Sequence, residues 1–274
     1  MKILLYALTF SLLSAQVLAN EAQLEQCEKE GRNFGNGQGR DYLPFECFNL
    51  FLSAANPAAI KKSNGGKFSA YGYRNIVFIK DPSARIGLQN IIAGSSTLIT
   101  EVVALAIDEV NKEIAVLDKS GDILFFSSTI TGNIAPKRVL KAKELDGAHD
   151  LVINSVRQEV IALNKQNHDL VVFSREANFF GVEGKKKLGL IRSVDGVNGE
   201  FLSIDPHHQE LFMLNSSGDS ILVFNLNSKS QNPVRKLNLP EKSVKRIDYS
   251  SESDEIKFIG AKGEVRISRI KKNI

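Results

Sequence analysis

The chain has 274 residues, and its 35 Lys and Arg residues nearly balance 31 Asp and Glu residues, for a formal net charge of +4. This balance argues against a nucleic-acid-binding surface, which needs a concentrated basic patch. The length suits one propeller or barrel with a large core. No stretch after residue 19 is apolar enough to span a bilayer, so we expect no membrane span.

Residues 1–19 have the pattern of a secretory signal peptide. Lys2 supplies the positive charge, Ile3–Leu13 forms a short apolar run, and Val17 and Ala19 fit a cleavage site. The alternative is an uncleaved anchor, for which the apolar run is short. We expect a mature chain that begins at Asn20 and is periplasmic or secreted.

The two cysteines of the chain, Cys27 and Cys47, lie close to this expected N-terminus. In an exported protein an even pair predicts a disulfide, although two buried thiols would be the alternative. The charged segment 21–30 and the segment 44–55, apolar on one face, each suit a short helix. We therefore expect residues 20–66 to form an N-terminal cap of two short helices stapled by the disulfide.

A repeated pattern fills the rest of the chain. Each copy has an isoleucine followed by Asp, Asn or a similar acceptor, a short turn, and a glutamate that opens a second apolar strand. The isoleucines are 46, 51 and 43 residues apart, which matches one four-stranded propeller blade of about 40–50 residues. They are Ile107, Ile153, Ile204 and Ile247.

Two further strands follow in most repeats, and we name the four strands a, b, c and d from the axis outward. Strand c is apolar, as in Ile123–Phe126, and strand d follows a proline, as in Pro136–Leu140. Partial repeats stand at both ends of the array, with strands c and d near 75–79 and 88–92 and no strand d after Ile267. We predict an all-β propeller of four to five four-stranded blades over residues 67–274, with the two ends completing each other.

This pattern resembles the propeller repeats of the NHL and YVTN families over residues 73–270. The likeness lies in the apolar-Asp turn, the strand ending in Asp or Asn, the "ILVF" strand of 221–224 and the Pro-x-Arg segments Pro136–Arg138 and Pro233–Arg235. The resemblance implies the fold and leaves the function open, because propellers host unrelated activities.

The Asp and Asn residues at the ends of strand a predict hydrogen-bonded turns rather than a catalytic or metal site. Short side chains there can accept hydrogen bonds from turn N–H groups. They are Asp108, Asn154, Asp205 and Asp248. His207 and His208 fall in one such a–b turn, and we expect them to be exposed.

The loops from strand d to the next strand a differ between repeats, so we expect a binding face there. Its candidate residues are Glu101, Asp146, His149, Asp150, Asp195, Asn198 and Glu200. If they gather at the axis they form an acidic mouth whose oxygens would suit a calcium ion. Since neighbouring strand residues point to opposite faces, His149 and Asp150 should not line the same site.

The sequence holds no nucleophile elbow, HExxH, P-loop or CxxCH motif. We therefore expect no catalytic residues, no cofactor and no resident metal, and a propeller that binds a protein, peptide or envelope component on its loop face. The alternative is a metal-dependent hydrolase of lactonase-like type, which would need at least three acidic or amide side chains at the axis. A third reading is a structural module whose incomplete blades pair between chains.

Overall fold

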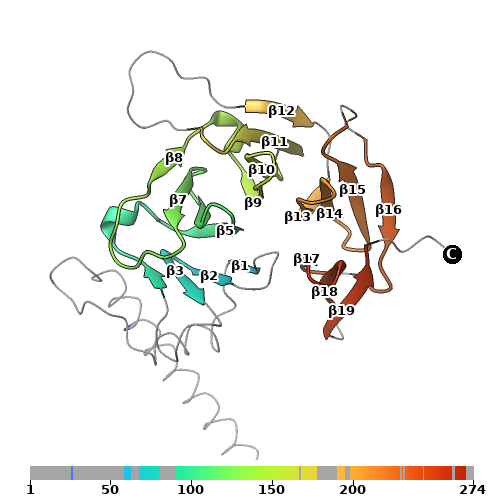
Figure 1. Cartoon of the computed structure of the whole chain (residues 1–274), viewed down its shortest axis with the longest axis horizontal. Helices are drawn as coiled ribbons and strands as arrows, with labels where there is room; N and C mark the ends of the chain where they lie inside the picture. The colour runs from blue at the N-terminus through green and yellow to red at the C-terminus, as the bar shows by residue number, and fades with distance from the viewer. Residues whose placement is uncertain are drawn as a thin grey trace, which may run out of the picture.

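The computed structural model describes residue 26 and residues 59–62, 68–80, 90–166, 168–177, 190–194, 198–228, 230, 232–242, 244–260 and 263–269. These residues form five antiparallel sheets arranged around an axis, as Figure 1 shows. The sheets are the blades of a propeller, numbered 1 to 5 along the chain. The five-blade count lies within the predicted range.

In every blade the strands follow one another outward in chain order. Blade 1 has β1 (Ala59–Lys62), β2 (Ser69–Tyr73), β3 (Ile76–Lys80) and β4 (Asn90–Ile92). Blade 2 has β5 (Val102–Asp108), β6 (Glu113–Asp118), β7 (Ile123–Ser127) and β8 (Arg138–Leu140). Blade 3 has β9 (Ala148–Asn154), β10 (Glu159–Asn164), β11 (Asp169–Ser174) and β12 (Leu190–Val194).

Blade 4 has β13 (Gly199–Asp205), β14 (Glu210–Asn215), β15 (Ser220–Asn225) and β16 (Arg235–Asn238). Blade 5 has three strands among the described residues, namely β17 (Ile247–Ser250), β18 (Glu255–Gly260) and β19 (Gly263–Ser268). Two single-turn 3₁₀ helices, Ser95–Thr97 and Lys143–Leu145, lie in the d–a connections. No helix among the residues described is long and apolar enough to cross a membrane.

Apolar strands face one another between consecutive blades and form the core. Separate clusters of buried side chains fill the interfaces of blades 1 and 2, 2 and 3, 3 and 4, and 4 and 5. Phe125 and Phe173, for example, are completely buried between blades 2 and 3. Because both faces of strands b and c are covered in blades 2 to 4, these strands are apolar along most of their length instead of alternating.

The interface between blades 5 and 1 differs from the other four. The described residues of blade 5 share an apolar core with blade 4 only. Its inner strand β17 packs against β13, whereas β17 and β1 make far fewer contacts than the other neighbouring inner strands. Among the described residues, blade 5 therefore packs mainly against blade 4.

The two ends of the chain do not complete each other's blades as expected among the described residues. Blade 1 has a strand b, β2, and an inner strand of its own, β1, which lies within the segment 20–66. Blade 5 lacks a strand d among the described residues. The two cap helices and the Cys27–Cys47 disulfide lie outside those residues, with only Gln26 described there, in helical conformation.

The prediction for strand a of the last repeat is wrong by two residues. Ser250, not Asp248, pairs with Glu255 and ends strand a. The turn is then four residues long, as in the other blades, and its last residue, Asp254, has a φ of 51°, close to the 56° of Gln209 in blade 4. Asp248 lies within the strand, opposite Lys257, because an Ile-Asp pair occurs there by coincidence with the motif.

Candidate functional site

A cavity of about 460 Å³ lies on the propeller axis. It is lined by residues of the inner strands of all five blades and by the residues that lead into β17. Because these inner strands surround the axis in Figure 1, the cavity is the central channel. Most of the lining is apolar, with charge only at a few positions. The lining residues are Ala59, Ile60, Lys61, Val103, Ala104, Leu105, His149, Asp150, Phe201, Leu202, Lys245, Arg246 and Ile247.

A β-bulge at the start of strand a brings His149 and Asp150 into this channel together. The pairing of β9 with β10 skips His149, since Asn164 pairs with Ala148 and Leu163 with Asp150. The prediction that the two side chains face opposite ways is therefore wrong, because a bulge breaks the alternation of a strand and re-aims a side chain. The same irregularity occurs in blades 2 and 4, where it falls at Val103 and Glu200.

The Asp150 carboxylate ties blade 3 to blade 4. Its Oδ2 accepts a 2.6 Å hydrogen bond from the Leu202 N–H, and its Oδ1 accepts one of 2.9 Å from the Leu151 N–H. Burial raises the pKa of Asp150, while the charge of Lys61 and these N–H groups oppose that effect. Oδ2 thus links β9 to β13, whereas Oδ1 binds the backbone of β9 itself.

His149 is also held by the backbone of blade 4. Its Nε2 lies 2.9 Å from the Glu200 carbonyl oxygen, which requires the proton to sit on Nε2. Nδ1 is then the acceptor nitrogen, and it is buried without a hydrogen-bond partner in the described part of the chain. Burial lowers the pKa of His149, so the ring is neutral near pH 7.

The glutamates expected at the mouth are paired with lysines. Lys119 Nζ lies 2.5 Å from the Glu101 carboxylate, and Lys165 Nζ lies 2.6 Å from that of Glu200. Each lysine directly follows a strand b. Lys165 belongs to blade 3, whereas Glu200 belongs to blade 4. Their positive charge compensates the carboxylates that were expected to hold a cation.

Asp146 and Asn198 are not among the residues that line the channel. Asp146 and Asn198 are exposed and touch the neighbouring loop through their backbone carbonyl oxygens, which accept from Asn164 Nδ2 and the Ser216 N–H. Asp195 lies outside the described residues. Of the six predicted residues that the structure describes, it brings only His149 and Asp150 into the channel lining.

Sequence reasoning missed the cations of the channel. Lys61 Nζ donates a 3.0 Å hydrogen bond to the Leu202 carbonyl oxygen, Lys245 is exposed, and Arg246 lies 3.0 Å from Asp248. Lys61 could not be recognised as a channel residue because the sequence of β1 does not follow the repeat. Lys245 and Arg246 could have been found from a correct alignment of the last blade. The described lining therefore contains these three cationic residues and a single carboxylate, that of Asp150.

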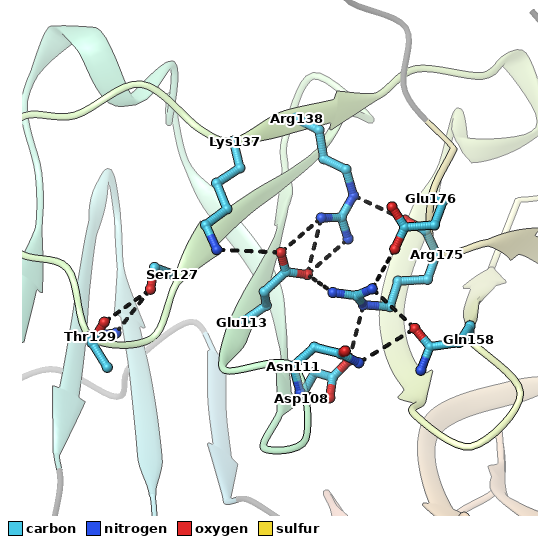
Figure 2. Close-up of polar contacts among 10 residues, drawn as sticks. All are labelled: Asp108, Asn111, Glu113, Ser127, Thr129, Lys137, Arg138, Gln158, Arg175 and Glu176. Atoms are coloured by element: carbon cyan, nitrogen blue, oxygen red, sulfur yellow. Dashed lines mark hydrogen bonds and ion pairs between the residues drawn. The ribbon is translucent and has the colours of Figure 1, made fainter.

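The opposite, a–b face carries a buried ion-pair network between blades 2 and 3 (Figure 2). The Glu113 carboxylate is only 4% exposed. It accepts a hydrogen bond of 3.0 Å from Arg138 of its own blade and one of 2.7 Å from Arg175 of blade 3. Arg175 also lies 3.1 Å from Asp108, and the Arg138 guanidinium sits 3.6 Å from the Phe125 ring centroid. Asp108 accepts the Asn111 N–H as the predicted turn acceptor.

Blades 4 and 5 repeat this arrangement. Arg235 of strand d and Arg269, which follows strand c of blade 5, both bind Glu210, at 2.7 and 3.2 Å. Asp205, Asp254 and His208 lie close enough together to suggest a metal site. Arg269 occupies that place, 2.6 Å from Asp254 and 3.5 Å from Asp205, so the cluster is an ion-pair network. His207 and His208 are exposed, as predicted.

No protein-family model and no curated protein matches the chain. Among solved structures it is similar to the WD40 β-propeller domain of Doa1, with a TM-score of 0.51 and 10% identity over 78% of this chain and 66% of that one. It is also similar to a chain in the nidogen/laminin complex, with a TM-score of 0.53 and 12% identity over 77% of this chain and 74% of that one. Together with the five sheets around one axis, these likenesses confirm the predicted resemblance at the level of the fold, and the chain is a five-bladed β-propeller.

Proposed function

We propose that the chain is a non-catalytic binding propeller that holds a protein or peptide at the mouth of its central channel, on the d–a face. The observation that carries this proposal is the state of Asp150, the only carboxylate in the described channel lining, whose two oxygens are both occupied by backbone N–H groups. What remains for a ligand is an apolar wall with Lys61 and Lys245.

The alternative, a metal-dependent hydrolase, would need at least three acidic or amide side chains around the axis. The described lining offers one. A hydrolase would also need a base beside a nucleophile or a bound water. His149 donates from Nε2 to a main-chain oxygen, and Asp150 accepts from main-chain groups, so the two side chains do not form such a couple.

The structural neighbours agree with binding without proving it. One of them is a chain in a complex of nidogen with laminin, which is by its description a protein–protein complex. A shared fold does not carry function by itself. The argument therefore rests on the channel, where rigid inner strands present loop-proximal residues that differ from blade to blade.

Blocking the channel mouth should abolish this binding. Peptides selected on the native protein from a random display library should lose affinity by about tenfold or more for Val103→Trp, which fills the channel, and for Phe201→Ala, which removes an apolar contact. Lys236→Trp, on the exposed outer strand β16, is the matched control and should bind normally. Affinity would be measured by fluorescence anisotropy.

Two results would contradict the proposal. The first is selected peptides that bind Val103→Trp and Phe201→Ala as tightly as the native protein. The second is calcium-dependent hydrolysis of lactones or phosphoesters by the native protein that Glu200→Gln abolishes.

We further propose that the protein is exported and that its N-terminal segment is a disulfide-stapled cap, which follows from residues 1–19 and from Cys27 and Cys47. The protein recovered from the periplasm or medium should have the intact mass of a chain that begins at Asn20. After alkylation without reductant, neither cysteine should carry the label. A chain that retains Met1 would contradict export, and two labelled thiols would contradict the disulfide.

A further inference from the structure

The charges in the central channel leave one positive charge unbalanced. Arg246 is paired with Asp248 at 3.0 Å. The charge of Lys61 acts on Asp150, where it opposes the rise in the pKa of that carboxyl group. Lys245 is exposed and makes no ion pair among the residues that the structure describes. Since the glutamates at the mouth are already paired with lysines, a ligand with one negative charge is complementary to the channel.

The cavity occupies the half of the channel next to the d–a face. Each inner strand follows a d–a connection, so it begins at that face and runs toward the a–b face. Among the described residues of β5, β9 and β13, only those at the first four positions of each strand line the cavity, namely residues 103–105, 149–150 and 201–202. A ligand therefore enters from the d–a face and reaches the end of the cavity midway along the inner strands.

Lys61 supplies a hydrogen-bond donor at this deep end. Its half-buried ammonium donates a 3.0 Å hydrogen bond to the carbonyl oxygen of Leu202, the deepest lining residue of β13. An ammonium group has three N–H groups, and this is the one hydrogen bond that Lys61 makes with the described residues. The other N–H groups remain available beside apolar side chains such as those of Leu105 and Ile247. In such surroundings a carboxylate is the acceptor that an ammonium binds most strongly.

The size of the cavity favours a chain end over an internal segment. Its volume of about 460 Å³ lies within the range of about 300–1,000 Å³ that is usual for small-ligand sites. An internal segment that enters and leaves through the d–a face has to bring two lengths of backbone into this space, whereas a C-terminus brings one. A C-terminus also carries one negative charge whatever its sequence.

We propose that the channel captures the free C-terminus of a partner protein. The terminal carboxylate accepts hydrogen bonds from Lys61, and the last side chains, which are apolar, pack against Phe201 and Leu105. Lys245 at the mouth attracts the same negative charge during association. This inference rests on the proposed function, because it names the part of the partner that the channel holds.

The test compares peptides that differ only in their last group. Peptides would be selected on the native protein from a library displayed with free C-termini, and each would be synthesised as the acid and as the amide. The amide should bind the native protein about tenfold or more weakly by fluorescence anisotropy, because it lacks the charged acceptor for Lys61.

Substituting Lys61 identifies the group that reads the carboxylate. Lys61→Met should bind the acid about as weakly as the native protein binds the amide, and it should no longer distinguish the two forms. Lys236→Met removes the same charge from the exposed outer strand β16 and should retain the full preference for the acid. Circular dichroism melts would confirm that both variants fold, and the comparison of acid and amide on the native protein needs no variant.

The outcomes separate this inference from the proposed function. Peptides that lose affinity for Val103→Trp but bind the native protein equally as acid and amide would overturn the capture of a C-terminus and leave binding in the channel intact. An acid preference that persists in Lys61→Met would overturn the role of Lys61 and with it the inference. Peptides that bind Val103→Trp as tightly as the native protein would instead contradict the proposed function itself.

Discussion

Glu113→Ala should lower the free energy of unfolding by about 3–5 kcal/mol, the cost of removing one partner from a buried ion pair. The substitution leaves the guanidinium groups of Arg138 and Arg175 facing each other, both less than a tenth exposed, without the carboxylate that they share. For a domain of this size the loss corresponds to a fall in melting temperature of roughly 6–20 °C. Urea denaturation followed by circular dichroism would measure it.

The chain contains a matched control at the same position of another blade. Glu255 opens strand b of blade 5 as Glu113 does in blade 2, but it is partly exposed and makes no ion pair among the described residues. Glu255→Ala should therefore change stability by about 0.5 kcal/mol or less. Equal losses for both variants would show that the network between blades 2 and 3 contributes no more than a surface glutamate.

Phe212→Ala should cost about 3–5 kcal/mol and should release blade 5 before the rest of the protein. Phe212 is completely buried between blades 4 and 5, with its ring centroid 5.5 Å from that of Tyr249. Since the described part of blade 5 has no second apolar interface, this cavity weakens its main attachment. Hydrogen exchange by mass spectrometry should show faster exchange in β17–β19 than elsewhere.

Phe173→Ala provides the comparison. Phe173 is equally buried, but it lies between blades 2 and 3, and both of these blades have a second apolar interface. We expect a similar loss of stability with no preferential exchange in blade 5. If Phe212→Ala accelerates exchange evenly over all five blades, blade 5 is held as firmly as the others and the weak seam to blade 1 has no consequence.

The repeat was readable because blades impose the same environment on each copy. Apolar residues recur wherever strands b and c are covered on both faces, and turn acceptors recur where strand a ends, as at Asp108 and Asp205. The last copy was misaligned because the order Ile-Asp also occurs at Ile247, two residues before the equivalent position. A motif of two residues is too short to show which of two positions ends the strand. The pairing of β17 with β18 shows it directly.

The candidate site was harder to predict from the chain alone. Period-two alternation placed His149 and Asp150 on opposite faces, but the bulge in β9 places both in the channel. A bulge depends on the pairing of two strands, so it leaves no signal within either one. The sequence also did not reveal that lysines compensate the charges of Glu101 and Glu200 at the expected acidic mouth. These lysines become neighbours of the two glutamates only when the loops fold together.

The sequence by itself determined the propeller class, the position of most strands and three of the four turn acceptors, because these depend on local patterns repeated along the chain. Only the tertiary structure decided how many blades there are, which charges meet in the channel and which neighbouring blades share an apolar core among the described residues. Those properties depend on contacts between residues far apart in the chain, such as Lys61 with Leu202 and Arg175 with Glu113. Residues at such separations meet only when the blades assemble around one axis, which is why the function of this propeller has to be sought in its central channel.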